Sequence, residues 1–218
     1  MDLDSCLIKC KYLFFLFFLN LFSTYVYSNS ITQPSISIII DDLGYKLKED
    51  VRALSLPGPV AYAILPHAPH TKKMVSIASQ NGKEILLHQP MQALENNDLL
   101  GPGALTLNMT QREFTQTLEI NINAVQNIIG INNHMGSLLT RHPGHMQWLM
   151  NIIKKNEYIY VDSLTSADSV AKKIAEENQI PFLSRDIFLD NKKDLLVSLL
   201  EFHFLYSSFH GLWPGSLL

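Results

Sequence analysis

The chain from Pro34 onward alternates short apolar runs with longer stretches in which apolar residues recur at helical spacing. Six runs predict β-strands, at 35–40, 60–65, 84–87, 128–132, 158–161 and 180–184. Five stretches predict helices, at 46–54, 70–80, 111–125, 144–155 and 167–178. Strands and helices that alternate in this way form a mainly parallel sheet, either open or closed into a barrel. The predicted fold class is therefore α/β.

Two of the predicted helices carry sequence signals at their starts. Thr110 and Glu113 have the spacing of a capping box, in which each side chain bonds the backbone N–H of the other residue. Pro143 stands just ahead of the fourth helix, a position that suits its fixed φ and its missing N–H. Both signals favour helices that begin near these residues.

The first residues of the chain have the pattern of a secretory signal. An apolar run at 12–22 follows Lys9 and Lys11 and precedes small and polar residues near Ser28. The run is shorter than the roughly 20 residues that cross a bilayer as a helix. We expect residues 1–28 to be a cleaved signal peptide and the protein to be exported to the periplasm or cell envelope, touching the membrane only through that segment. The alternative is an uncleaved signal anchor.

Composition narrows the possible chemistry. A length of 218 residues, with 47% hydrophobic and 17% charged, suits one globular domain, which we place at 35–193. The net charge of −3 and the lack of a long basic run argue against nucleic acid as a partner. Both cysteines, Cys6 and Cys10, lie in the predicted signal segment. A metal site would therefore use histidine and carboxylate side chains.

Acidic and histidine residues stand where four of the predicted strands end. Asp41 and Asp42 follow the first strand, His88 the third, His134 the fourth and Asp162 the fifth. Ligands of parallel α/β folds gather at the carboxyl ends of the strands. We therefore expect these side chains to meet.

A carboxylate and two imidazoles leave part of a divalent cation's coordination open, as in catalytic metal sites. Of the paired acids, we assign Asp42 to the metal and Asp41 to the general base, although spacing does not decide between them. A strand-end histidine can also be an ordinary loop residue, and Asp42 could instead cap the next helix. The remaining histidines of the predicted domain are expected to be structural or substrate-facing: His67, His70, His142 and His145.

Six motifs in this order resemble one protein family, the divergent polysaccharide deacetylases, which are the YibQ-like group of bacterial envelope proteins. The motifs are IDDLG at 40–44, LLHQPM at 86–91, GPGALT at 101–106, NNHMGS at 132–137, DSLTSADSVA at 162–171 and RDIFLDN at 185–191. The resemblance spans roughly 35–193.

This resemblance implies a deformed (β/α) barrel related to carbohydrate esterases that remove acetyl groups from chitin-like or peptidoglycan sugars. It implies zinc or a similar divalent ion on Asp42, His88 and His134, with Asp41 as the base. Three further residues match family motifs and are expected to line the pocket, to contact substrate or to orient a ligand imidazole: Asp162, Arg185 and Asp186.

The sequence departs from related families in two places. Ordinary polysaccharide deacetylases carry their two metal histidines four residues apart, whereas here Gln92 and Leu138 occupy those positions. Each histidine should therefore come from its own strand. The family usually continues past Asn191 into more barrel, but 194–218 is mostly apolar, with Glu201 as the one acid after Asp194. We expect an aberrant or truncated tail and a barrel that is incomplete at its C-terminus, or alternatively a buried helix or partner-binding segment.

Two classes of function remain open from the sequence. The first is an exported, metal-dependent hydrolase that deacetylates an envelope polysaccharide or peptidoglycan-like glycan. The second is a non-catalytic envelope protein that binds a glycan or a partner, or an inactive truncated copy.

Overall fold

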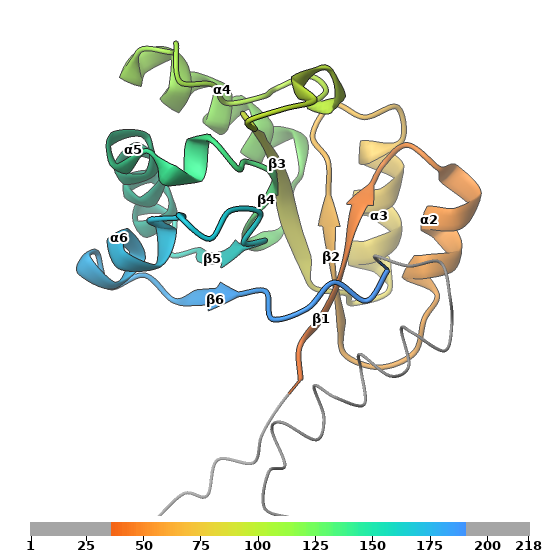
Figure 1. The fold of residues 1–218 in the computed structure, drawn as a ribbon. Coiled ribbons are helices and arrows are strands. Elements are labelled where there is room, and N and C mark those ends of the chain that lie inside the picture. Colours follow the sequence, from red (N-terminus) through yellow and green to blue (C-terminus); the bar gives the residue numbers. More distant parts are fainter. Residues whose placement is uncertain (1–35, 191–218) are drawn as a thin grey trace, which may run out of the picture. The chain divides into compact units, whose positions relative to one another are not determined.

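The computed structural model describes residues 36–190 (Figure 1). The predicted signal peptide at 1–28 and the predicted tail at 194–218 lie outside the described residues. Over 36–190, no helix is long and apolar enough to cross a membrane.

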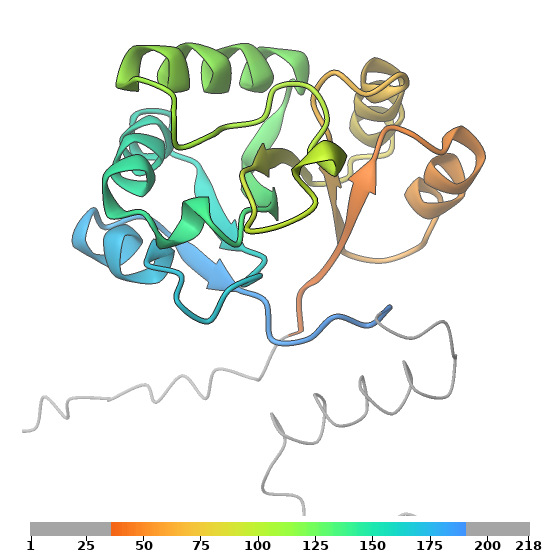
Figure 2. The ribbon, with the colours of Figure 1, turned by 45° about the horizontal axis from the view of Figure 1, so that its top comes forward.

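Six parallel strands form one sheet in sequential order. They are β1 (Ile38–Leu43), β2 (Val60–Ile64), β3 (Ile85–Met91), β4 (Ile128–Met135), β5 (Ile159–Asp162) and β6 (Phe182–Ser184). The sheet is curled, with helices around its outer side (Figure 2). Among the described strands, β1 and β6 do not pair with each other. The fold is therefore an open half-barrel, which confirms the predicted α/β barrel architecture.

Five helices alternate with these strands and two short 3₁₀ turns lie in the loops. They are α2 (Leu47–Leu54), α3 (Thr71–Gln80), η1 (Asn97–Leu99), α4 (Gln111–Ala124), η2 (Leu139–Arg141), α5 (Pro143–Lys155) and α6 (Ala171–Glu177). The predicted capping box is present, since Thr110 Oγ1 accepts from Glu113 N at 3.3 Å and Glu113 Oε2 accepts from Thr110 N at 2.8 Å. Pro143 is the first residue of α5.

The two faces of the sheet differ in what they bury. Side chains such as Leu87, Ile131 and Tyr160 face the helices and belong to the main hydrophobic core. Ala63, Leu86 and Val161 form a separate small cluster. Because successive side chains of a strand point to opposite faces, this second cluster marks the inner face of the half-barrel. Alternation along each strand then tells which polar residues share that inner face.

Several predicted boundaries were wrong. β1 runs from Ile38 to Leu43 and not over 35–40, β3 continues to Met91 and β4 to Met135, because backbone pairing persists beyond the apolar runs, with Leu43 opposite Ile64 and Pro90 opposite His134. The candidate residues of these strands therefore lie within the strands and not after them. The last helix begins at Ala171 instead of residue 167. Ser169 Oγ bonds the Asp162 carboxylate at 2.7 Å, and such side-chain bonds hold the preceding loop out of the helix.

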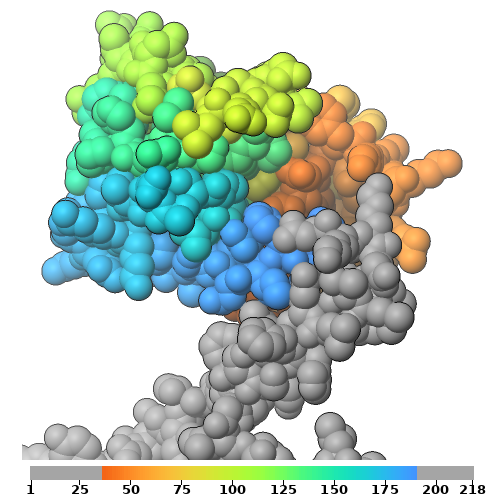
Figure 3. Space-filling model, viewed as in Figure 1, coloured from red at the N-terminus to blue at the C-terminus, as the bar shows by residue number. Residues whose placement is uncertain are grey.

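The chain leaving β6 crosses the open side of the half-barrel. Residues 186–190 run from β6 toward β1 in both ribbon views, and their atoms lie beside those of the first strand's region in the space-filling view (Figure 3). This segment therefore lies alongside β1 on the open side of the half-barrel.

Candidate metal centre

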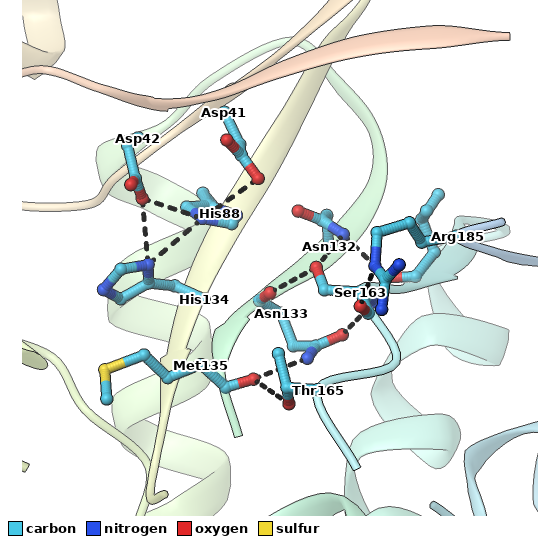
Figure 4. Close-up of polar contacts among 11 residues, drawn as sticks. Asp41, Asp42, His88, Asn132, Asn133, His134, Met135, Ser163, Thr165 and Arg185 are labelled. Atoms are coloured by element: carbon cyan, nitrogen blue, oxygen red, sulfur yellow. Dashed lines mark hydrogen bonds and ion pairs between the residues drawn. The ribbon is translucent and has the colours of Figure 1, made fainter. Parts of the chain in front are cut away.

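A β-bulge at the end of β1 directs two neighbouring acids toward one place. Ile40 pairs with Tyr62 and Leu43 with Ile64, so β1 has one more residue than β2 over this stretch. Asp42 takes a left-handed φ of 59° there, a conformation that aspartate tolerates better than most residues. Asp41 and Asp42 therefore both approach His88 instead of pointing to opposite faces (Figure 4).

The turn after β1 is held by a buried carboxylate. Asp50 Oδ2 accepts from Gly44 N at 2.9 Å and from Lys46 N at 3.1 Å. Gly44 has a φ of 131°, and an added Cβ would lie 2.7 Å from Ala68 Cβ. This tight turn requires glycine and keeps the bulge in place.

His88 and His134 come from neighbouring strands and meet Asp42 on the inner face. Asp42 Oδ1 lies 2.9 Å from His134 Nδ1 and 3.1 Å from His88 Nε2. The two ring nitrogens are 3.2 Å apart. His88 is nearly buried, at 2% exposed, whereas the Asp42 side chain is 62% exposed. One side of the triad thus faces protein and the other faces solvent.

This triad has the donor set of a divalent cation site. Two imidazole nitrogens and one carboxylate oxygen converge so that each atom is within 4.8 Å of the others. When both imidazoles are neutral, at most one proton can lie between His88 Nε2 and His134 Nδ1. At least one of these nitrogens then has its lone pair directed into the space between the three side chains. A cation such as Zn²⁺ accepts three such ligands and keeps further positions open. The residues present therefore fit the metal that the sequence predicted.

Electrostatics separate the two acids. Hydrogen bonds from His134 and His88 hold the pKa of Asp42 far below its usual range. Desolvation raises the pKa of Asp41, and the negative charges of Asp42 and Asp190 add to this effect while His88 opposes it. Asp41 Oδ2 is 3.9 Å from His88 Nε2. The two imidazoles thus favour the ionised form of Asp42, whereas Asp41 binds a proton more readily than an ordinary aspartate.

Asp162 lies on the other side of the sheet. It follows Val161, which faces inward, so alternation turns Asp162 toward the helices, where it is 1% exposed. Its carboxylate accepts from Leu164 N at 2.8 Å and from Ser169 Oγ at 2.7 Å. Over 36–190, no hydrogen bond joins Asp162 to His88 or His134. The contacts of this carboxylate order the loop after β5.

Arg185, the residue after β6, hydrogen-bonds the same loop. Its Nε donates to Ser163 O at 2.7 Å and an Nη donates to Leu164 O at 2.9 Å. The guanidinium lies 3.7 Å from the centre of the Phe188 ring. Burial lowers the pKa of Arg185, with the charges of Asp162 and Asp186 opposing. Asp186 itself is exposed. Arg185 thus holds the loop after β5 through two backbone carbonyl oxygens.

Two residues near the centre were missed by the sequence analysis. Asn132 is the direct register partner of His88 on β4. Asp190 is close enough for its charge to raise the pKa of Asp41. Alternation from His134 could have identified Asn132, and the second acid of the motif at 185–191 could have identified Asp190.

Three other histidines have their own polar contacts away from the triad. His67 Nε2 lies 2.9 Å from Asn121 Oδ1, and the Nδ1 atoms of His142 and His145 are 3.0 Å apart at the start of α5.

Comparison with known proteins agrees with the fold and the motifs. Residues 38–200 match the family described as divergent polysaccharide deacetylase. An uncharacterized protein of Haemophilus influenzae is 37% identical over 174 residues, covering 79% of this chain and 62% of that protein. The uncharacterized protein YibQ of Escherichia coli K12 is 30% identical over 167 residues, covering 77% of this chain and 52% of YibQ. This chain therefore matches about half to three-fifths of the length of those relatives.

A solved structure has a similar fold. The crystal structure of the uncharacterized protein ATU2773 from Agrobacterium tumefaciens C58 matches with a TM-score of 0.76 at 20% identity, covering 83% of this chain and 77% of that one. The family match spans most of the chain and includes the three residues of the triad. The chain belongs to the divergent polysaccharide deacetylase family.

Proposed function

We propose that this protein is a metal-dependent hydrolase that removes acetyl groups from a polysaccharide of the cell envelope. The convergence of Asp42, His88 and His134 within 3.2 Å of one another, with Asp41 beside them, carries the proposal. Family membership supports a glycan as the substrate. The apolar run at 12–22 supports export to the periplasm or envelope.

Asp42, His88 and His134 would hold the cation, with zinc the best match to two imidazoles and one carboxylate. The chemistry that a divalent cation supplies at such a site is Lewis acidity, which activates water and polarises a carbonyl group. His88 is fixed by burial, and Asp42 is fixed by its bulge and by the turn behind it. The protein thereby keeps the three donor atoms converged at little entropic cost on binding.

Asp41 is the base in this proposal. Water adds to the acetyl carbonyl carbon and its proton passes to an Asp41 carboxylate oxygen, which the raised pKa of Asp41 favours. The same proton then passes to the departing sugar nitrogen as the carbon–nitrogen bond breaks, so acetic acid and a free amine result, and the acid then releases its proton to water as acetate forms. The 43% exposure of the Asp41 side chain leaves room for a substrate to approach it.

The test measures metal and acetate in the same preparations. Purified protein is dialysed against zinc and then against buffer, and bound metal is measured by elemental mass spectrometry. Acetate release from N-acetylglucosamine oligomers and from acetylated peptidoglycan is then followed. We expect about one zinc per wild-type chain and acetate release from at least one glycan.

The matched variants are His134→Ala, which removes a triad member, and His142→Ala, which removes an exposed histidine outside the triad. Only His134→Ala should lose both metal and activity. Loss of metal from both variants, or a metal-free wild type, would contradict the proposal. Zinc binding without acetate release from any glycan would favour the non-catalytic glycan-binding alternative.

A further inference from the structure

We propose that Asn132 is a positioning residue for this metal centre. Its side-chain oxygen accepts the Nδ1 proton of His88 and so orients the ring with Nε2 free for the cation. The inference rests on the proposed function, because it concerns the same centre.

The first observation is a pair of buried polar atoms that lack partners. Among the described residues, neither His88 Nδ1 nor Asn132 Oδ1 has a hydrogen-bond partner, although His88 is 2% exposed and Asn132 is 3% exposed. Leaving such atoms unpaired costs stability, so native proteins pair most of them. His88 Nδ1 can donate a hydrogen bond when it carries a proton, and Asn132 Oδ1 can only accept one. The two atoms can therefore pair with each other.

The second observation is their placement. His88 on β3 and Asn132 on β4 are direct partners in the parallel register, so their side chains lie next to each other on the inner face. The carboxamide oxygen of Asn132 is on the side of His88 in the close-up view (Figure 4).

The third observation fixes which end of the amide faces His88. Asn132 Nδ2 donates to Val161 O at 2.9 Å and to Ser163 Oγ at 2.9 Å. Both amide protons are therefore used on the β5 side, and flipping the amide would place its oxygen against a carbonyl oxygen. The acceptor end is held toward His88 by the strand and loop behind it.

This pairing decides the tautomer of His88. With the proton on Nδ1, the Nε2 lone pair faces His134 Nδ1 and Asp42 Oδ1, at 3.2 Å and 3.1 Å. A partner on the remote nitrogen of a ligand histidine orients the ring and raises its basicity, and losing one typically lowers metal affinity about 10- to 100-fold.

Zinc affinity of the full chain, measured by competition with a chromophoric chelator, tests the proposal. We expect Asn132→Leu to weaken binding about 10- to 100-fold. Ser163→Ala is the matched control, because it removes a partner of Nδ2 and leaves Oδ1 in place, and it should bind zinc like the wild type. Equal affinities for wild type and Asn132→Leu, or equal losses in Asn132→Leu and Ser163→Ala, would overturn the proposal.

A readout on the metal-free protein separates this inference from the proposed function. Imidazole ¹⁵N NMR should show His88 protonated on Nδ1 in the wild type, with a slowly exchanging proton signal that Asn132→Leu loses. A wild-type His88 that carries no proton on Nδ1 would overturn the inference. Failure of the wild type to bind zinc would instead contradict the proposed function, whatever the tautomer.

Discussion

Two acids at strand ends look alike in the sequence and have different surroundings in the structure. Asp42, at the end of β1, faces the inside of the half-barrel and lies within 3.1 Å of two imidazole nitrogens. Asp162, at the end of β5, faces the helices, where its carboxylate accepts from Leu164 N and Ser169 Oγ. A bulge turns Asp42 toward solvent and the two imidazoles, and regular alternation buries Asp162.

The comparison shows that the direction of the backbone decides whether a strand-end acid meets the two imidazoles or is buried on the outer face of the sheet. Asp162 is 1% exposed, while the Asp42 side chain is 62% exposed. We therefore expect changes at Asp42 to affect metal and catalysis, and changes at Asp162 to affect stability.

The largest effect is expected for Asp42→Ala. Removing one of three ligands should abolish stoichiometric zinc binding, and deacetylation should fall by on the order of 10³-fold, because several kcal/mol of charge stabilisation are lost. Bound metal and kcat/KM measure this outcome. Asp162→Ala, assayed at a temperature where it stays folded, should keep its zinc. If both variants lost zinc equally, the contrast between the two acids would be wrong.

Asp41→Asn should separate catalysis from metal binding. The asparagine cannot accept the proton of the attacking water, so kcat should fall about 10²- to 10⁴-fold. Zinc content should stay at the wild-type level, because Asp41 Oδ2 is 3.9 Å from His88 Nε2 and Asp42 makes the shorter contacts. Loss of zinc from this variant would place Asp41 among the ligands and reverse the assignment of the two acids.

Asp162→Ala should lower the free energy of unfolding by about 1 to 3 kcal/mol, because it leaves the Leu164 N–H and the Ser169 hydroxyl without their acceptor. Urea denaturation with zinc chelated measures the change. The exposed ion pair of Asp168 with Arg141, 3.2 Å long, supplies the control. Asp168→Ala should cost less than about 1 kcal/mol, and an equal loss in both variants would argue against a special role for Asp162.

The smallest expected effect is a pH-dependent difference in how Asp41 and Asp42 change the Tm of the metal-free protein. The pKa of Asp41 is raised, so its ionised form destabilises the fold once pH rises through that pKa. Asp41→Asn should therefore have a higher Tm than the wild type at pH 7, and the gain should vanish below the ordinary carboxyl pKa of about 3.9.

Asp42 should behave in the opposite way, because its pKa is lowered and its ionised form stabilises the fold above the ordinary carboxyl pKa. Asp42→Asn should have a lower Tm than the wild type at pH 7, with the difference closing as pH falls through the lowered pKa. Tm shifts of the same sign for both variants at pH 7 would contradict the electrostatic separation of the two acids.

The order of elements and the triad could be predicted from the sequence because both depend on local pattern. Apolar runs and helical periodicity identified the strands and helices of 36–190, and parallel strands bring their carboxyl ends to one edge. That rule grouped Asp42, His88 and His134 although they lie far apart in the chain. It also grouped Asp162 with them, which was wrong. The predicted segments at 1–28 and 194–218 remain predictions.

Other features depend on the direction in which each side chain points, and only the tertiary structure decided them. The bulge before Leu43 brings Asp41 and Asp42 toward His88, and the residue pattern did not predict this bulge. The inward direction of Val161 turned Asp162 to the outer face, and the register of β3 with β4 put Asn132 beside His88. A sequence records which residues follow one another, whereas the face and register of a strand are set by the packing of all its neighbours.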